Sequence, residues 1–407
     1  MGGGDHPASI DLPWLYEQVN DHRTSTVKIY VWLQYYLDGW NVKTERLLDF
    51  LIYSLFVTLL AWFAHRRQAS LPLWAILGFV IFLFSMIVWP DPLMPQYSVA
   101  VHFWLLSFVI SAYLMFSEQQ VWTAVLAGCT LAVLSIYSFA GGFVTSAIVL
   151  ISYALFKCTR LGTSDNRRRE IVQLAAAIFI IGGAIVSWLI DYQRPAYIPG
   201  LAWPYQKSFW GFFLNVLSFS FGFDTMSQTI GVGCLLVVII PIAGEIWRRR
   251  ARLSVHHWFF FAVTLALLAD LCAVSMGRAN GFGIGWSKVG EYPEHGMPLI
   301  VLSAVNWGIF CENRLTRIIV VSAFWALCCA AFADNWDFTR YDRSAVKDLA
   351  TYRCVEAYYA GTGEGHCQGT FGTYPHPEVL LDKAKRLNLS FYREMMKEIR
   401  TPPSVEN

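Results

Sequence analysis

Positions 20–23 hold the first residues whose types and spacing suit catalysis, with the sequence Asn-Asp-His-Arg. Asp21 and His22 set a carboxylate beside an imidazole, two side chains that serve as acid and base in enzymes. Arg23 adds a guanidinium, which binds anions through two parallel hydrogen bonds. A helix cap followed by a solvated charge cluster has the same composition, and the spacing alone favours that interpretation over catalysis.

A second group lies in the segment 277–298, which is rich in glycine and carries basic and acidic side chains. Arg278, Lys288 and His295 are side chains of the kind that hold the phosphate of a lipid carrier at a membrane surface. The glycines allow the backbone to approach such a ligand closely. A flexible loop whose basic residues form salt bridges with its own glutamates explains the composition equally well.

The segment 191–207 combines aromatic residues with three prolines, and Arg194 is its candidate for substrate binding. Aromatic faces stack well on sugar rings and apolar chains. An aromatic belt at the membrane–water interface has the same composition, and this interpretation is favoured.

Two acidic residues lie within apolar stretches. Asp270 is a functional candidate because an ionisable group inside a membrane is energetically expensive, although pairing with a neighbouring span would also explain it. Glu245 lies near the end of its stretch, where it can reach the interface or pair with Arg248.

Motifs of soluble enzymes are absent from the sequence. There is no Walker A loop, dinucleotide fingerprint, nucleophile elbow or zinc-binding spacing. His256 and His257 are adjacent, so they face different sides of a helix and do not readily share a metal ion. Any chemistry must therefore be built from loops at the membrane surface.

The composition is that of a membrane protein. Of the 407 residues 56% are hydrophobic and only 15% are charged, against about 25% charged in an average soluble domain. This excludes a disordered chain, a fibrous repeat and an ordinary cytosolic enzyme. A net charge of +2, from 31 basic and 29 acidic residues, gives no indication of a nucleic-acid partner.

The apolar stretches predict an all-α, polytopic bundle of about ten transmembrane helices. The predicted spans are 46–65, 71–90, 98–117, 120–137, 141–157, 171–190, 227–247, 256–276, 298–311 and 315–333. The stretch 208–221 is expected to be an interfacial or re-entrant helix. The chain thus divides into an amphipathic N-terminal segment (1–45), the bundle (46–333) and a small helical tail (334–407).

The orientation follows from the basic residues of the short loops. Four clusters, at 66–67, 157–169, 248–252 and 314–317, fall on one side of the ten spans. Because short cytoplasmic loops are enriched in Lys and Arg, we place that side in the cytoplasm. Both termini are then extracytoplasmic.

The tail 334–407 is expected to pack on the outer face of the bundle through two amphipathic helices, 343–359 and 376–398. Cys354 and Cys367 flank a glycine-rich stretch within it. In an oxidising compartment these two residues are expected to form a disulfide, the alternative being two free thiols.

The order of these features resembles a group of bacterial multi-pass proteins allied to GT-C glycosyltransferases. The resemblance rests on five short motifs that span most of the chain. They are Asn-Asp-His-Arg at 20–23, Ser-Phe-Ala-Gly-Gly at 138–142, the Tyr- and Pro-rich segment 191–205, Gly-Arg at 277–278 followed by Ser287-Lys288 and Glu291-Tyr292, and Tyr-Pro-His-Pro at 374–377. The family has Ser-Arg-Tyr where this chain has the altered residues after Gly-Arg, which puts the basic residue there in doubt.

The resemblance implies a sugar transferase of a bacterial inner membrane that uses a polyprenyl-phosphate-linked sugar at the outer face. It implies that Asp21 is the catalytic acid residue with His22 and Arg23 as its neighbours, and that Arg278 and Lys288 hold the lipid phosphate. Arg23, His295 and Arg194 are further candidates for substrate binding from the composition of their own segments. In the family the acidic residue acts as base or positions a metal ion. A divalent metal would fit, but no metal-ligand motif is seen, so the cofactor stays open.

The family also has a span before the first outer loop, whereas this sequence begins within the corresponding loop. We therefore expect either a truncated or misassigned start, or a partner subunit that supplies the helix. Membrane lipids and the lipid-linked sugar are the other expected partners. The alternative functions are a non-catalytic membrane subunit or scaffold of a larger complex and, less favoured, a transporter, for which Asp270 and Asn306 are the only indications.

Overall fold

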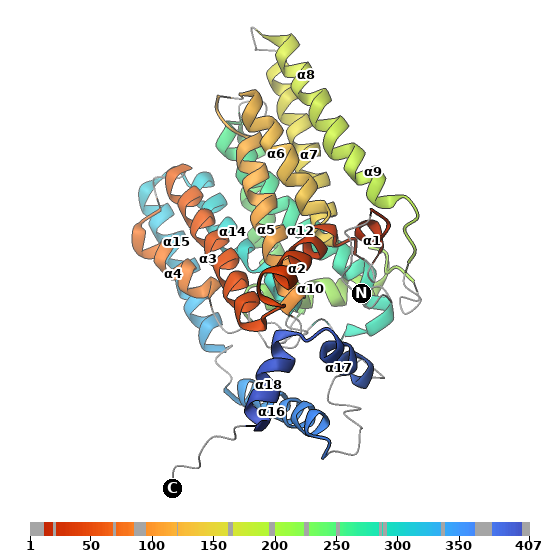
Figure 1. Ribbon diagram of the computed structural model, residues 1–407. Coiled ribbons are helices and arrows are strands. Elements are labelled where there is room, and N and C mark those ends of the chain that lie inside the picture. The colour runs from red at the N-terminus through yellow and green to blue at the C-terminus, as the bar shows by residue number, and fades with distance from the viewer. Residues whose placement is uncertain are drawn as a thin grey trace.

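The computed structural model describes residues 12–18, 22–67, 71–84, 95–119, 121–161, 166–194, 200–223, 228–249, 253–284, 287, 291–334, 338–362 and 377–400. The regular elements of these residues are helices. In chain order they are α1 (Leu12–Tyr16), α2 (Ser25–Asp38), α3 (Val42–Arg67), α4 (Leu73–Leu83), α5 (Pro95–Met115), α6 (Trp122–Ile136), α7 (Ala140–Leu161), α8 (Arg167–Ala177), the π-helical turn η2 (Ile178–Gly182), α9 (Gly183–Leu189), α10 (Lys207–Ser220), α11 (Gln228–Arg249), α12 (Val255–Phe282), α13 (Glu291–Gly296), α14 (Pro298–Phe310), α15 (Arg314–Asp334), α16 (Phe338–Ala360), α17 (Pro377–Arg386) and α18 (Ser390–Arg400). Figure 1 shows the long helices side by side, with α16, α17 and α18 at one end.

Within the described residues, six helical stretches are long and apolar enough to cross a membrane. They are Lys43–Arg66, Ala140–Leu161, Arg167–Leu189, Gln228–Arg249, Val255–Gly281 and Arg314–Asp334. The other four predicted spans fall on α4, α5, α6 and α14. In its described residues the protein is therefore all-helical with six candidate membrane-spanning helices, and the total of about ten stays a prediction.

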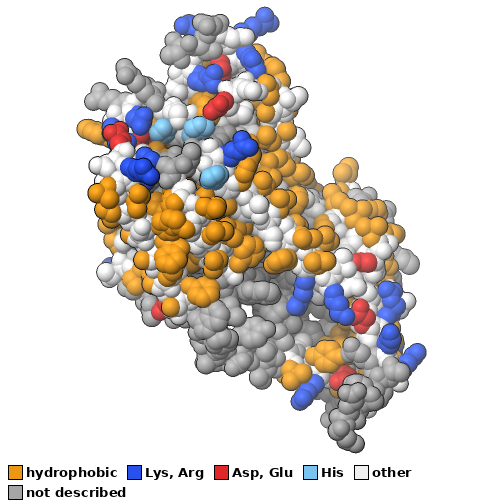
Figure 2. Space-filling view, turned by 90° about the vertical axis from the view of Figure 1, so that its left-hand side faces the viewer, with side chains coloured by type: hydrophobic (Ala, Val, Ile, Leu, Met, Phe, Trp, Pro, Cys, Tyr) orange, Lys and Arg blue, Asp and Glu red, His pale blue; other side chains and the backbone are white. Residues whose placement is uncertain are grey.

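The surface agrees with a membrane environment. Only 22% of the apolar window in Arg167–Leu189 is buried inside the protein, although this stretch has a mean hydropathy of 2.2. Phe179 and Val186 of this stretch are largely exposed. Figure 2 shows a broad hydrophobic band on one face, with charged side chains gathered above and below it. A helix that is apolar on all sides and still exposed is stable only where lipid replaces water.

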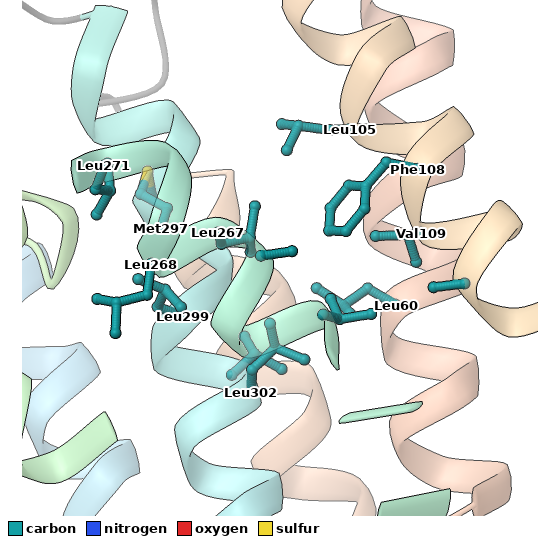
Figure 3. Close-up of a cluster of buried hydrophobic side chains, with 14 of the residues drawn as sticks. Leu60, Leu105, Phe108, Val109, Leu267, Leu268, Leu271, Met297, Leu299 and Leu302 are labelled. Carbon is teal, nitrogen blue, oxygen red and sulfur yellow. The ribbon is translucent and has the colours of Figure 1, made fainter. Parts of the chain in front are cut away.

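The core of the bundle lies between α3, α5, α12 and α14. Leu60, Phe108, Leu267 and Leu302 are among its buried side chains, and Figure 3 shows them between the facing helices. Val255–Gly281 is the most enclosed of the six stretches, with 61% of its apolar window buried. α12 is therefore the central helix against which the site residues are placed.

α10 is an internal helix. Ten consecutive residues, Gly211–Ser220, are buried beneath α11, α12 and α13. An interfacial helix would expose one polar face, so that alternative for 208–221 is wrong, whereas a re-entrant helix remains in agreement with the burial.

One end of the bundle, here called the basic end, is held by ion pairs between loops. Arg248 lies 3.1 Å from Glu312 after α14, and His256 lies 3.3 Å from Glu118 after α5. Glu245 accepts hydrogen bonds from Arg248 and Arg249, which confirms the expected pairing with Arg248. Segments that are distant in sequence therefore meet at one end of the bundle. This agrees with the prediction that the clusters of basic residues lie on one side of the spans.

The tail packs at the opposite end, here called the tail end. α16, α17 and α18 share a small core of Val355, Leu381 and Met395. The expected single helix 376–398 is wrong, because the chain turns between α17 and α18 at Asn388, which has a φ of 49°. Asn adopts this left-handed conformation more readily than most residues, and it ends the first helix.

The tail is attached to the corner between α2 and α3. The Ser390 backbone N–H donates to the Gly39 carbonyl at 3.0 Å, and the Ser390 hydroxyl donates to the Trp40 carbonyl at 2.6 Å. Lys43 pairs with Glu394 at 2.9 Å. The N-terminus of α18 thus docks directly on the bundle.

Cys354 is not among the free cysteines of the described residues. Its expected partner Cys367 lies outside those residues, so the disulfide stays a prediction.

Candidate functional site: a buried acid–imidazole cluster

Five ionisable side chains lie inside the bundle toward the tail end and form what we call the acid–imidazole cluster. Its members come from four helices: Asp49 on α3, His102 on α5, Asp270 on α12, and Glu294 and His295 on α13. His102, Asp270, Glu294 and His295 are buried, and Asp49 is partly exposed. Charged groups cost several kcal/mol to bury unless they are paired, so their gathering here is a strong indication of function.

Asp270 and His295 form the first pair of the cluster. The His295 Nδ1 lies 2.8 Å from the Asp270 Oδ2, and neither side chain is more than 2% exposed. If Asp270 is ionised, this contact places the proton on Nδ1 and leaves Nε2 as an acceptor. His295 Nε2 is buried with no hydrogen-bond partner in the described part of the chain. The pair thus offers an oriented imidazole with a free nitrogen.

α13 carries this imidazole into the bundle. The short helix lies between α12 and α14 in the chain and packs against both, and against α10. Gly296 makes the approach to α10 feasible, because a Cβ at this position would overlap the side chain of Ser220. The predicted loop 277–298 is therefore helical at both ends, since α12 continues to Phe282 and α13 lies in the protein interior.

Asp49 and His102 form the second pair. His102 Nδ1 lies 2.6 Å from Asp49 Oδ1, and His102 Nε2 lies 3.8 Å from Glu294 Oε2. The ring of Tyr53 lies over that of His102 with 4.5 Å between centroids. Asp49 and His102 are each seven residues from the start of their helices, about 10 Å along the axis. The imidazole thus stands between two carboxylates.

Phe139 connects the first pair to the N-terminal motif. Its ring stacks on His22 at 4.2 Å and meets His295 edge-on at 5.4 Å. Trp104 stacks on the same ring at 5.6 Å and lies 4.8 Å from His295. The Ala140 N–H donates to His22 Nδ1 at 3.2 Å. His22 and His295, two residues singled out from distant motifs, are therefore brought together across one phenylalanine.

Gly141 allows this arrangement to close. A Cβ at this position would lie 2.7 Å from Asp270 Oδ1 and 2.7 Å from the Trp104 ring. Trp104 is further fixed by the hydrogen bond from its Nε1 to Thr145 Oγ1 at 2.9 Å. The Ser-Phe-Ala-Gly-Gly motif therefore supplies both the ring and the space beside the carboxylate.

Arg23 has a structural role in this region. Its Nε donates to the Trp188 carbonyl at 2.9 Å, its Nη1 to the Tyr16 carbonyl at 2.6 Å and its Nη2 to the Ile190 carbonyl. The guanidinium also stacks over the Tyr16 ring at 4.2 Å. It thereby joins α1 to the end of α9, and anion binding by Arg23 stays a prediction.

Lys28 reinforces the same junction from α2. Its Nζ donates to the carbonyls of Trp14 at 2.6 Å and Glu17 at 2.8 Å. Burial lowers the pKa of Lys28 below its ordinary value, although the nearby Glu17 acts in the opposite direction. The region that follows Asp21 is therefore anchored by two cationic side chains on backbone carbonyls.

The remaining predicted site residues are distributed differently. Asp21 and Lys288 lie outside the described residues. Arg278 is half-buried on α12, two turns beyond Asp270, and Arg194 is exposed. Convergence of Asp21, Arg278 and Lys288 thus stays a prediction.

Sequence reasoning missed Asp49 and His102 as site residues and did not select Glu294 within its loop. The signal was present, because Asp49 and His102 are ionisable residues inside predicted spans 46–65 and 98–117. In the described residues no group of three or more His, Cys, Asp and Glu side chains is arranged to hold a metal ion. Comparisons of the chain with family models, curated proteins and solved structures gave no match.

Proposed function

We propose that the chain is a GT-C-like glycosyltransferase that moves a sugar from a polyprenyl-phosphate carrier to an acceptor at the outer face of a bacterial inner membrane. The observation that carries this proposal is the meeting at Phe139 of residues from three separate segments. His22 of the first motif, Phe139 of the second and His295, three residues after the fourth motif, are in ring contact. Motifs that are scattered in sequence but contiguous in space are typical of one functional site.

The Asp270–His295 pair is suited to the proton transfer of this reaction. An acceptor hydroxyl must lose its proton as it attacks the sugar, and a positioned imidazole accelerates such a step by about 10²–10⁴. His295 Nε2 accepts the proton in this proposal, while Asp270 holds the ring and stabilises the imidazolium. Asp21 is a second proposed catalytic carboxylate beside Asp270, with the role that the resemblance implies for it.

The departing group is a lipid phosphate, on which negative charge grows as the sugar leaves. Fixed cations stabilise this charge most strongly where water is scarce. Arg278, which is half-buried on α12, and Lys288 are the proposed phosphate partners. Trp104 and Phe139 place aromatic rings beside His295, and aromatic side chains suit contact with a sugar ring. Because His295 is buried, the acceptor reaches it only after a neighbouring segment moves.

In this proposal the tail end faces the extracytoplasmic compartment and the basic end faces the cytoplasm, in accordance with the distribution of Lys and Arg. The loops that carry the proposed site residues and both termini then lie outside. A reporter fused after Asn407 that is active only in the cytoplasm would overturn this orientation.

The experiment uses the full-length protein in lipid nanodiscs with a panel of polyprenyl-phosphate-linked sugars and a membrane extract as acceptor. Release of polyprenyl phosphate is the readout. We expect His295→Gln, Asp270→Asn and Asp21→Asn to lower the rate by about 10²–10⁴, and Arg278→Ala to weaken engagement of the donor. His256→Gln, which removes a histidine at the basic end, is the matched control.

Retention of the wild-type rate by both His295→Gln and Asp21→Asn would refute the catalytic assignment. Absence of release with every donor would instead favour the non-catalytic membrane subunit.

One observation favours a second candidate function, a proton-coupled transporter. Asp49–His102 and Asp270–His295 are two acid–imidazole pairs inside the bundle, with all members except His295 on long apolar helices, and such pairs form proton relays in transporters. Asn306 adds less, because its Nδ2 donates to Thr264 within the core. Acidification of proteoliposomes on addition of a substrate gradient would distinguish this function from sugar transfer.

A further inference from the structure

The contacts of His102 point to an activity that the sugar-transfer proposal does not require. We propose that His102 relays protons between Glu294, inside the bundle, and Asp49, at its edge. The basis is the geometry of one imidazole whose two nitrogens face two different carboxylates, at 2.6 Å and 3.8 Å.

The exposure of the three side chains gives the relay a direction. The side chain of Asp49 is 17% exposed, that of His102 is 5% exposed and that of Glu294 is 0% exposed. Protons therefore exchange with the surroundings at Asp49, and the imidazole connects Asp49 to Glu294. This order runs from the protein edge to α13, the same helix that carries His295.

The transfer is balanced at each atom. Protonated Glu294 gives its proton to His102 Nε2 as the Nδ1 proton passes to the Asp49 carboxylate. The N–H bond at Nε2 forms while that at Nδ1 breaks, so the ring stays neutral and changes tautomer, and Asp49 then releases the proton. The 3.8 Å separation on the Glu294 side must shorten to a hydrogen-bond length of about 2.9 Å, which a small rotation of the Glu294 side chain achieves.

The electrical environment favours protons at this site. Among the described residues, Tyr30 on α2 and Glu45 on α3 interact electrostatically with Asp49, and Tyr53 on α3 interacts with Glu294. Glu45 is fully buried one turn before Asp49, with Trp40 Nε1 3.2 Å from its Oε2. Arg46 and Asp38 act on Glu45. Two carboxylates, Asp49 and Glu294, thus face one imidazole with a third, Glu45, one turn away, and repulsion between like charges favours a proton shared among such groups.

The relay is tested by infrared spectroscopy of the full-length protein in lipid nanodiscs, transferred into heavy water. The readout is the rate at which the carbonyl-stretch band of protonated carboxyl groups shifts on deuteration. Glu294→Gln is expected to remove a slowly exchanging part of this band. His102→Gln is expected to keep that part and to slow its exchange by about a hundredfold, the lower range for loss of a positioned acid–base group.

Asp49→Asn keeps the helix and removes the outer acceptor, so it is expected to slow the same exchange if His102→Gln does not fold. His256→Gln, at the basic end, is the control and is expected to exchange as the wild type does. Exchange at the wild-type rate in folded His102→Gln, or a band unchanged by Glu294→Gln, overturns the relay. No sugar donor is present, so this outcome is independent of the transferase test.

Discussion

Replacement of Arg23 by Met separates the structural role of this residue from the anion-binding role expected from the sequence. The Arg23 side chain is buried and donates to three carbonyls on two distant parts of the chain, Tyr16 on one side and Trp188 and Ile190 on the other. The last carbonyls of a helix have no partner within it. Loss of the guanidinium therefore removes this bridge between the end of α9 and the α1 segment, while the two hydrogen bonds between Gln18 and Gln193 remain.

The magnitude follows from these contacts. A hydrogen bond to a charged group contributes about 1.5–3 kcal/mol, so three such bonds set an upper limit of about 9 kcal/mol. Such contributions are not additive, and the freed carbonyls near the surface regain water. We therefore expect Arg23→Met to lower the free energy of unfolding by about 3–5 kcal/mol.

The assay is unfolding in mixed micelles, followed by tryptophan fluorescence, together with amide hydrogen exchange of residues 12–18 and 187–193. Exchange in both segments is expected to accelerate in Arg23→Met. Arg66→Met is the matched control, because Arg66 is exposed at the end of α3, and we expect it to change stability by less than about 1 kcal/mol. Equal stability of the two variants, with substrate binding lost only in Arg23→Met, would refute the structural role.

Three further predictions concern packing. Lys157 is fully buried and lies 2.5 Å from Glu170, so Lys157→Met is expected to lower the free energy of unfolding by about 3–5 kcal/mol in the same assay. Adding Glu170→Leu is expected to restore most of this loss. Additive losses in the double variant would contradict the pairing. Gly141→Ala is expected to lower the free energy of unfolding by about 1–3 kcal/mol, because the added Cβ overlaps Asp270 and Trp104. Gly183→Ala is the control, because a Cβ at this position meets nothing within 4 Å. Equal thermal midpoints of the two variants would contradict the overlap. Ser390→Ala removes the hydrogen bond to the Trp40 carbonyl, which is expected to weaken the docking of the tail by about 1 kcal/mol. Limited proteolysis is then expected to cleave the tail faster. Unchanged cleavage would show that the docking does not depend on Ser390.

Long apolar helices were predictable because a single pattern, a long run without charge, determines them. The expected span 141–157 lies within α7, Ala140–Leu161, and 227–247 coincides closely with α11, Gln228–Arg249. The two-helix arrangement of the tail was not predictable in the same way. The turn at Asn388 depends on one backbone conformation inside an otherwise continuous amphipathic pattern.

The site was predictable in part. His22 and His295 were identified from residue type and loop position, and ring contacts with Phe139 bring them together. The role of Arg23 could not be read from spacing, since two of its partners lie 165 and 167 residues away. Asp49 and His102 were overlooked because single polar residues in strongly apolar runs do not change the prediction of a helix.

The docking of α18 on the Gly39–Trp40 corner has a consequence for biosynthesis. The Ser390 hydroxyl that bonds the Trp40 carbonyl is translated 350 positions after its acceptor. The α2–α3 corner is thus completed long after α3 has been synthesised, with almost the whole time of translation in between. Until then the α2–α3 corner lacks its contacts with α18 and is accessible to chaperones and proteases. The α2–α3 corner therefore reports whether synthesis has reached α18, since only a chain that contains this helix completes the corner.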